Sequence, residues 1–408
     1  MNKIELLAGA GNMERLKTAF YFGADAAYIG GKMFGLRAFA DNFSLEEIDE
    51  ALKYAHSIGK KLYVTVNIFA HEEDIDGLKE YIGALVDICV DALIISDPGI
   101  FSITKSIDKN IDIHVSTQAN TTNYMSANFW YELGAKRIIL ARELGLEEIK
   151  HIRDNTPKDL EIEAFVHGAM CMSYSGRCLL SSFLEGRDPN RGQCVQSCRW
   201  EYALVEKKRE GQYFPIAEDE RGTYILNSKD LMMLEHVDKL REAGISSFKI
   251  EGRMKTAFYT ATTVRAYRKA IDIYNGDPKN YKCPEVLLKD IEKASHRPYC
   301  TGFYFGKIDM QNTESSEYIK PYDFIGVSKS YNKESKQLTL EQRGKFSVGD
   351  MIEILSPNLE SIPFEVEYIL NEKGEQVLSA PTAQQIVTIN CPFNSQEPDI
   401  LQKRNNKL

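Results

Sequence analysis

Four of the chain's eight cysteines lie close together near the middle of the sequence. They are Cys171, Cys178, Cys194 and Cys198, with the spacing C-x6-C-x15-C-x3-C. Glycines and arginines punctuate residues 163–200, so we expect this stretch to be a loop built around a bound group rather than a helix or a strand. Thiolates select zinc or iron–sulfur clusters over magnesium or calcium.

The spacing of the cysteines does not match the usual zinc pattern. Zinc knuckles and ribbons prefer two C-x2-C pairs, whereas the gaps here are wider and unequal, which suits iron–sulfur ligation at least as well. Arg177 and Arg199 flank the cysteines and would offset the negative charge of a cluster. Structural zinc and buried structural cysteines are the alternatives.

Length and composition place the chain among ordinary globular proteins. Its 408 residues are enough for one large domain and a smaller one, and no apolar run reaches the ~20 residues of a membrane helix. The N-terminus does not read as a secretory signal, so we expect a cytoplasmic protein with no membrane partner. In a reducing cytosol, clustered cysteines favour ligands over disulfides. The net charge of −9 argues against broad nucleic-acid binding but allows a local basic patch.

Short β-branched runs alternate with amphipathic segments from the N-terminus onward. The predicted strands are residues 4–8, 26–29, 62–68, 92–95, 113–116, 137–140, 162–166 and 248–250. The predicted helices are residues 13–22, 44–57, 75–89, 99–107, 126–133, 146–154 and 231–243. Eight strands, each followed by a crossover, predict an α/β fold of the (β/α)8 TIM-barrel type. A doubly wound sheet is the alternative, but residues 9–14 lack the third glycine of a dinucleotide-binding turn.

The cysteine stretch begins where the seventh predicted strand ends. It belongs to a long insertion, residues 169–230, which carries a polar hairpin candidate at 205–224. From about residue 321 the pattern changes to short strands, at 324–330, 337–342, 351–355, 362–369, 376–378 and 385–388. We therefore predict a barrel domain over residues 1–300 and a small all-β domain over 321–408, with residues 402–408 frayed.

Polar side chains follow several of the predicted strands. Because barrel enzymes keep their chemistry at the carboxyl ends of the strands, these side chains are candidates for proton transfer or hydrogen bonding. The catalytic candidates are His114, Gln118, Glu143, His167 and Glu251. Each has a plainer interpretation as a polar residue of the barrel mouth, and His167 as a structural histidine.

Arginines near the strand ends indicate an anionic ligand, since a guanidinium holds a carboxylate with two parallel hydrogen bonds. The substrate-binding candidates are Arg37, Arg142, Arg177 and Arg253. Salt bridges to Glu143 or Glu251 are the alternative role for Arg37, Arg142 and Arg253. Arg177 belongs to a basic group that could contact RNA phosphates, or could be a solvated loop; its other members are Arg187, Arg191, Arg199 and residues 207–209.

Residues 163–182, with the run around Cys171 and Cys178, resemble the signature of peptidase family U32, the collagenase-like family. Residues 188–192 and 198–200 resemble its continuation, as do 6–28, 34–40, 227–231 and 249–255. The similarity covers residues 3–270, and the C-terminal module also looks like that of the family.

The chain looks most like the branch that forms 5-hydroxyuridine at the wobble position of tRNA. That resemblance implies oxygen-independent hydroxylation, a 4Fe–4S cluster on Cys171, Cys178 and Cys194, prephenate as a required small anionic metabolite, tRNA as substrate and the iron–sulfur assembly machinery as a partner. Some relatives have a further cysteine ligand where this chain has Met232. Cys198 is the best local substitute, and three thiolates with an open iron are the alternative.

Two other functions compete with hydroxylation. One is a peptidase, although the sequence has no Gly-x-Ser-x-Gly and no His-Glu-x-x-His motif. The other is a noncatalytic RNA-binding or scaffold protein whose metal is structural.

Overall fold

The computed structural model describes residues 3–36, 41–170, 173–197, 203–205, 213–215, 217–219, 222–224, 229–306, 318–358 and 361–405. Four residues singled out above, Arg37, Cys171, Cys198 and Arg199, lie outside these ranges, as do residues 206–212. No helix in the described part is long and apolar enough to cross a membrane.

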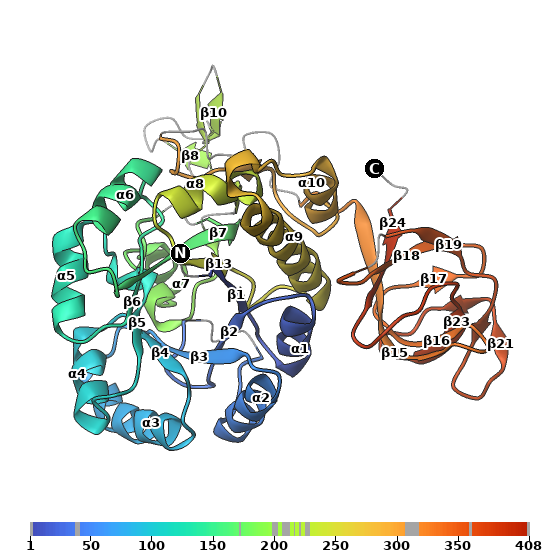
Figure 1. Cartoon of the computed structure of the whole chain (residues 1–408), viewed down its shortest axis with the longest axis horizontal. Coiled ribbons are helices and arrows are strands. Elements are labelled where there is room, and N and C mark those ends of the chain that lie inside the picture. Colours follow the sequence, from blue (N-terminus) through green and yellow to red (C-terminus); the bar gives the residue numbers. More distant parts are fainter. Residues whose placement is uncertain are drawn as a thin grey trace.

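Among the described residues, eight parallel strands form a closed barrel (Figure 1). In order around it they are β1 (Glu5–Gly9), β2 (Ala26–Gly30), β3 (Lys61–Val66), β4 (Ala92–Ile95), β5 (Ile113–Val115), β6 (Arg137–Ile139), β7 (Glu161–Ala169) and β13 (Ser247–Ile250). The last strand, β13, pairs in parallel with both β7 and β1 and so closes the ring. The predicted (β/α)8 barrel is confirmed.

Helices surround the barrel on its outer face (Figure 1). They are α1 (Met13–Tyr21), α2 (Leu45–Ser57), α3 (Ile75–Asp87), α4 (Pro98–Ile107), α5 (Tyr124–Glu132), α6 (Leu146–Asp154), α8 (Val237–Glu242) and α9 (Ala257–Gly276). Local signals set their starts: Ser44 and Glu47 form a capping box on α2, and Asp97 caps α4, which has Pro98 in its first turn. The helices therefore begin at the strand ends that form the mouth.

The interior of the barrel contains a buried ion network. Arg137 donates to Glu5 at 2.6 Å and to Glu163 at 2.8 Å, and Lys249 donates to Glu163 at 2.7 Å. Burial opposes ionisation of Glu5, but Arg137 more than offsets it and the pKa of Glu5 is lowered. Since removing one partner would leave an uncompensated buried charge, this network holds the strands in register.

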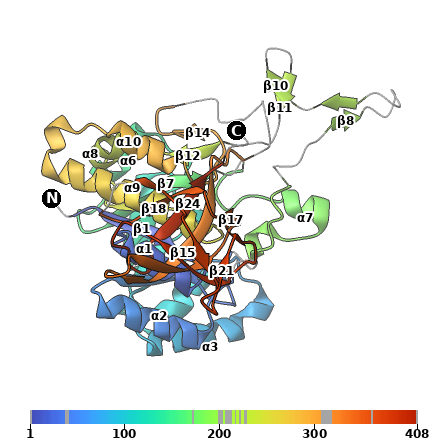
Figure 2. The ribbon, with the colours of Figure 1, turned by 90° about the vertical axis from the view of Figure 1, so that its right-hand side faces the viewer.

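The insertion between β7 and β13 carries small elements on one side of the barrel, and its hairpins project beyond the barrel's rim (Figure 2). Its described part contains α7 (Leu180–Glu185) and two hairpins, β8 (Ala203–Val205) with β9 (Tyr213–Pro215) and β10 (Ala217–Asp219) with β11 (Gly222–Tyr224). Sequence analysis predicted a single hairpin at 205–224. In Figure 2, β8, β10 and α7 project on the same side of the barrel.

The end of the insertion corrects a predicted helix. Residues 231–243 were expected to be helical throughout, but Leu231 lies in β12 (Asp230–Met232), and α8 begins only at Val237. The strand forms because Leu231 pairs with Gly168 at the extended end of β7 and with Cys300 in β14 (Tyr299–Cys300). These pairings are distant in sequence and override the local helical pattern.

The C-terminal region is all-β, as predicted. Its main sheet, in the order of its described strands, consists of β19 (Pro363–Glu365), β18 (Met351–Leu355), β24 (Ile400–Arg404), β15 (Tyr322–Asn332), β16 (Gln337–Gln342), β23 (Ile386–Asn390), β20 (Ile369–Leu370) and β21 (Gln376–Val377). A second small sheet pairs β17 (Phe346–Ser347) with β22 (Ser379–Ala380).

The structure contradicts the expected fraying of residues 402–408 over its described portion. β24 lies between β15 and β18 and pairs with both, and Ile400, Leu401 and Gln402 are fully buried. A strand with two neighbours is central to its sheet whatever the polarity of its sequence. Residues 406–408 lie outside the described residues.

The C-terminal sheet packs directly on the barrel through α9, with α10 (Glu285–Ile291) beside it. The rings of Phe258 on α9 and Phe324 on β15 stack at 5.9 Å. Val327, Leu355 and Ile400 belong to the same apolar cluster as the barrel's core. The position of the β domain beside the mouth is therefore maintained by buried apolar contact.

Candidate functional site

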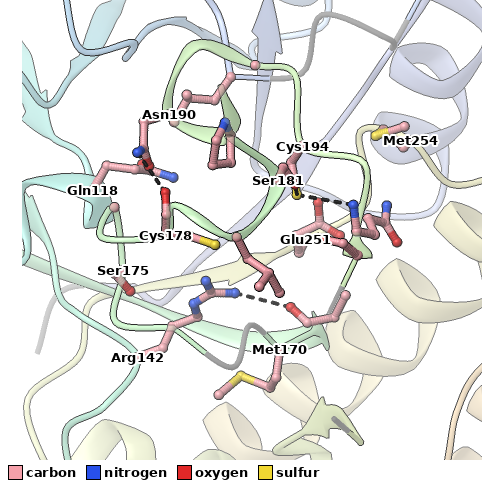
Figure 3. Close-up of a pocket in the computed structure, with 18 of the residues that line it drawn as sticks. Gln118, Arg142, Met170, Ser175, Cys178, Ser181, Asn190, Cys194, Glu251 and Met254 are labelled. Carbon is pink, nitrogen blue, oxygen red and sulfur yellow. Dashed lines mark hydrogen bonds between the residues drawn. The ribbon is translucent and has the colours of Figure 1, made fainter. Parts of the chain in front are cut away.

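A cavity of about 310 Å³ lies at the mouth of the barrel, under the cysteine loop (Figure 3). Cys178 and Cys194, separated by 15 residues in the sequence, both line it. Gln118, Arg142 and Glu251 line it from the ends of β5, β6 and β13. The mouth therefore brings together two thiols, a carboxylate, a guanidinium and an amide from the cysteine loop and the ends of three strands.

The cysteine loop is anchored to the loops after β5 and β6. The carboxylate of Glu143 accepts a hydrogen bond from the backbone N–H of Ser175 at 3.0 Å. Gly176 follows with φ +74°, and a Cβ there would lie 2.4 Å from the carbonyl oxygen of Gln118. Only glycine suits both this backbone conformation and this contact. The cysteine loop thus packs directly against the loop that carries Gln118.

A second set of contacts holds the far end of the same loop. Asn190 donates from its side-chain amide to the carbonyl oxygen of Cys178 at 2.9 Å. Arg191 forms an ion pair with Asp74, the residue directly before α3, at 2.7 Å. Cys178 is thereby fixed relative to the barrel. Arg191, a member of the predicted basic group, is engaged in this contact.

Among the described residues, two hydrogen-bond donors contact the sulfur of Cys194. The backbone N–H of Gln196 points to it at 3.4 Å, and the buried hydroxyl of Ser181 at 3.9 Å. Gln196 adopts φ +58°, an unusual conformation for a residue with a side chain, and this turn directs its N–H to the sulfur. Donors of this kind stabilise a thiolate and tune a bound metal group.

The residues present fit a thiolate-ligated group. Met170 and Ser197, which adjoin Cys171 and Cys198 in the sequence, line the same cavity as Cys178 and Cys194. No three His, Cys, Asp or Glu side chains form a metal-binding group within the described ranges, which exclude Cys171 and Cys198. Met170 and Ser197, which lie at opposite ends of the cysteine loop, nevertheless line one cavity.

Arg142 is oriented by the barrel and faces the cavity (Figure 3). One terminal nitrogen donates to the carbonyl oxygen of Ala169 at 3.1 Å, and the guanidinium lies 5.6 Å from the centre of the Phe165 ring. Its Nε is buried and has no hydrogen-bond partner among the described residues. Buried N–H groups normally have partners, so this donor is suited to a polar or anionic ligand.

A smaller cavity of about 50 Å³ lies beneath the first, inside the barrel. The two share Leu36, Gln118 and Glu251 as lining residues. Gln118 is oriented there, because its Oε1 accepts hydrogen bonds from Ser116 and from Asn67. The base of the mouth is therefore polar and built from strand ends.

Arg253 lies in the wall of this inner cavity and is 3% exposed. It donates to Thr65 at 3.1 Å and to Asn42 at 2.6 Å. A Cβ at Gly30 would lie 1.8 Å from its guanidinium, so the strand end must be glycine to admit it. Arg253 is thus a packed component of the barrel as well as a cavity residue.

The two domains match known protein families along almost the whole chain. Residues 11–314 match the model of peptidase family U32, and residues 320–402 match that of the peptidase family U32 C-terminal domain. This chain belongs to peptidase family U32.

Several curated relatives of this U32 chain have names that refer to RNA hydroxylation. A Bacillus subtilis tRNA hydroxylation protein P1 is 42% identical over 387 residues, covering 94% of this chain and 91% of the relative. An Escherichia coli tRNA hydroxylation protein P is 38% identical over 424 residues, covering 93% and 92%. An Escherichia coli 23S rRNA 5-hydroxycytidine synthase is 38% identical over 302 residues, covering 72% of this chain and 44% of the relative.

The U32 barrel places the two predicted histidines away from the mouth cavity. His114 faces the barrel interior, with its ring 4.6 Å from that of Tyr63, and burial followed by Arg137 lowers its pKa well below the ordinary value. His167 lies on the outer face of β7 against the rings of Tyr259, Tyr267 and Tyr299. Burial lowers its pKa to about 3, so both histidines are neutral.

The other predicted residues of the U32 site divide into groups. Gln118, Arg142, Glu251, Cys178 and Cys194 meet in the mouth cavity, Glu143 anchors the loop and Arg253 lines the inner cavity. Arg177 is exposed on the loop and does not line either cavity. Arg37, Cys171 and Cys198 lie outside the described residues.

Some site residues of the U32 chain were not found from its sequence. Ser181 and Gln196 contact the Cys194 sulfur, and Tyr318 reaches the cavity from beyond the barrel. Proximity to Cys194 was a usable signal for Ser181 and Gln196. Tyr318 follows none of the predicted barrel strands, so the strand-end criterion could not identify it.

Proposed function

We propose that this chain is a tRNA-modifying enzyme that converts the wobble uridine to 5-hydroxyuridine without molecular oxygen. The observation that carries the proposal is the convergence of cysteines with Gln118, Arg142 and Glu251 in one mouth cavity. Relatives matched over more than 90% of both chains are named as tRNA hydroxylation proteins, which supports tRNA as the substrate.

In this proposal, Cys171, Cys178, Cys194 and Cys198 hold a 4Fe–4S cluster, with Cys198 the fourth ligand or the fourth iron open. A bound cluster would supply electron-transfer chemistry next to the base. Ser181 and the backbone of Gln196 would orient the Cys194 sulfur as a ligand through the hydrogen bonds described above. Glu143 and Gly176 would keep the loop at the correct depth.

The remaining cavity residues would position the reactants. The guanidinium of Arg142 would hold a carboxylate of a small anionic metabolite, with prephenate as the expected one. The Gln118 amide, oriented by Ser116 and Asn67, would donate to a uracil carbonyl oxygen. The Glu251 carboxylate would accept the N3–H of the base and could hold a proton during the reaction.

The make-up of the cavity supports hydroxylation over peptide cleavage. Nucleophilic peptidases activate serine or cysteine with an adjacent base, usually histidine. Among the described lining residues there is no histidine, since His114 and His167 lie elsewhere. A Cys–His pair is therefore not part of the described cavity.

The function is tested in a strain that lacks this gene, by mass spectrometry of tRNA nucleosides after complementation. Wild-type protein should restore 5-hydroxyuridine. Arg142→Ala should lower the modification by about tenfold or more, since a charge-assisted hydrogen bond is lost, with little change in melting temperature. Arg253→Ala should instead destabilise the protein by about 2–4 kcal/mol, because it empties a packed site and removes the buried hydrogen bonds to Thr65 and Asn42.

Lys79→Ala, on the exposed face of α3, is the matched control and should behave as wild type. Restoration of 5-hydroxyuridine by Arg142→Ala at the wild-type level would remove Arg142 from the site. Absence of 5-hydroxyuridine in the strain complemented with wild-type protein would refute the proposed function.

The cofactor is tested separately from the modification. Anaerobic reconstitution should give about four iron and four sulfide per chain. Cys194→Ser should lower both, whereas Cys89→Ser, at an exposed thiol outside the loop, should not. One zinc per chain without sulfide would contradict the cluster. It would not bear on the tRNA substrate, which the nucleoside measurement tests.

A further inference from the structure

A groove of about 570 Å³ lies between the barrel mouth and the C-terminal β domain. The barrel contributes Met254 and Lys255, from the segment after β13, and the β domain contributes Phe324 and Lys345. Tyr318 lies in the chain between the two domains and also lines the groove. The site is therefore composite, and either domain alone would supply only part of it.

The groove continues into the mouth cavity. Met254, Lys255 and Tyr318 line both. A flexible polymer lying in the groove could therefore extend a side group into the cavity that contains Cys178 and Cys194. A small metabolite would not need this second compartment, so the continuity points to an extended ligand.

The groove is positively charged, although the chain carries a net charge of −9. Its described lining includes four basic residues, Lys255, Lys320, Arg343 and Lys345, and one acidic residue, Asp323. Lys320 pairs with Asp323 at 2.8 Å, and Arg343 pairs with Glu14 and Glu341. Lys255 and Lys345 form no ion pair with any described residue, so a cation on each wall is left for an anionic ligand.

Exposed apolar side chains accompany these cations. Tyr318 is 44% exposed and Met254 is 45% exposed. The ammonium of Lys255 lies 5.0 Å from the centre of the Tyr259 ring and 5.1 Å from that of Tyr318. The guanidinium of Arg297 lies 5.2 Å from the centre of the same Tyr318 ring and donates to its hydroxyl, so these cations fix the ring while 44% of Tyr318 stays exposed. Alternating cations and exposed rings are the usual means of binding single-stranded nucleic acid, because phosphates pair with lysine and bases stack on aromatic rings.

We propose that this groove binds the single-stranded RNA segment next to the target uridine. Phosphates contact Lys255 and Lys345, a base stacks on Tyr318, and the adjoining nucleotide enters the mouth cavity. The β domain is thereby assigned a direct part in RNA binding. This inference rests on the proposed function, since it takes tRNA as the polymer. An acidic peptide would satisfy the lysines but would not use the exposed ring of Tyr318.

The test measures binding of the full-length protein to a fluorescent, unmodified tRNA transcript with uridine at the wobble position. Lys345→Glu should weaken binding by about tenfold or more at low salt and reduce the slope of log K against log salt by about one unit, as loss of a phosphate contact does. Lys373→Glu is the matched control, since Lys373 is exposed in the turn before β21, and β21 lies on the side of the β domain away from the barrel (Figure 1). It should bind RNA as wild type does.

The stacking contact is tested at Tyr318. Tyr318→Ala should weaken binding by about 5- to 100-fold, the range for loss of one aromatic stacking platform. Tyr318→Phe keeps the ring and should retain binding, which separates stacking from loss of the hydroxyl. Melting temperatures of all variants show whether a loss of binding comes from misfolding, and Lys345, being exposed, should tolerate its substitution.

The outcomes distinguish the groove from the function itself. If wild-type protein binds and modifies tRNA but Lys345→Glu and Tyr318→Ala bind tRNA equally well, RNA binding in the groove is refuted and the proposed function stands. If polyglutamate displaces the transcript as effectively as unlabelled tRNA does, the groove is a site for acidic polymers and the RNA assignment fails. If wild-type protein neither binds the transcript nor restores 5-hydroxyuridine, both proposals fall.

Discussion

At the scale of single residues, His167 shows how a small irregularity redirects a side chain. Along a regular strand, residues two apart face the same side, so His167 should face the barrel interior with Phe165. The register of β7 against β13 shifts here: Phe165 is opposite Lys249, but His167 is opposite Ile250. This bulge adds a residue and turns His167 outward against α9.

Burial of His167 makes stability depend on pH. The pKa of His167 falls from 6.5 to about 3, and that of His296, beside Tyr299, falls to about 4, in both cases chiefly through burial. The unfolded chain therefore binds these protons first as pH falls. The free energy of unfolding therefore has its full value above about pH 6.5. As the pH falls toward 3–4, it decreases by about 1.4 kcal/mol per pH unit for each histidine.

His167→Phe should reduce this dependence. Between pH 7.5 and 5.5, the variant should lose about 1.4 kcal/mol less unfolding free energy than wild type, because one histidine titrates over about one unit of that range. Urea unfolding at the two pH values measures the difference. His151→Phe, at an exposed position on α6, is the control and should keep the wild-type slope. Equal slopes for wild type and His167→Phe would show that another group is responsible.

The rule that site residues follow the barrel strands predicted much of the candidate site. It did not predict how deep in the barrel each side chain lies. Gln118, Arg142 and Glu251 come from the ends of different strands and meet in one cavity, as expected of a parallel barrel. His114 was placed in the same group, yet it lies on β5 itself, deeper in the barrel against Tyr63. Its exact height in the barrel depends on strand stagger, which hydrophobic periodicity does not reveal.

At the scale of elements, local pattern predicted the eight barrel strands because each is a short buried run bounded by turns. The errors occur where pairing is remote. β12 forms because Leu231 finds partners on β7 and β14, and β24 forms because it fits between β15 and β18. Gln402 and Lys403 make the end of the chain look like a polar tail, but Gln402 donates to Glu353 and Lys403 to Asp350.

The central position of β24 predicts the effect of truncation. Ending the chain after Asp399 removes the strand that bridges β15 and β18 and exposes apolar surface of both domains. The protein should then lose the folded β domain and aggregate or unfold at a markedly lower temperature, since edges of β15 and β18 are left unpaired. Circular dichroism and size-exclusion chromatography measure this.

Ending the chain after Asn405 is the matched truncation. It removes only residues 406–408 and keeps every hydrogen bond of β24 to its neighbours. Its melting temperature should equal that of the full chain. A stable, monomeric protein truncated after Asp399 would show that β24 is dispensable.

At the scale of the whole molecule, α1 and α9 join the barrel to the β domain. On α1, Glu14 pairs with Arg343 and Tyr21 donates to the buried carboxylate of Asp399 at 2.9 Å. On α9, Arg265 donates to the carbonyl oxygen of Ser356 at 2.8 Å. These polar contacts surround the apolar contact of Phe258 with Phe324. Together they set the width of the groove that Lys255 and Lys345 share.

The Tyr21–Asp399 contact tests whether the domains unfold as one unit. Burial and then Asp399 raise the pKa of Tyr21 above its ordinary value, and burial raises that of Asp399, which is fully buried. Tyr21→Phe removes one donor from this carboxylate and should cost about 1–3 kcal/mol, the range for a buried acceptor that loses a partner. Because the contact spans the domains, calorimetry should show a lower and broader transition as the β domain separates first.

Tyr131→Phe removes the same hydroxyl from an exposed hydrogen bond to Asp159 within the barrel and should leave the transition nearly unchanged. Identical transitions in the two variants would mean that the interdomain hydroxyl contributes nothing and that apolar packing alone holds the β domain against the mouth.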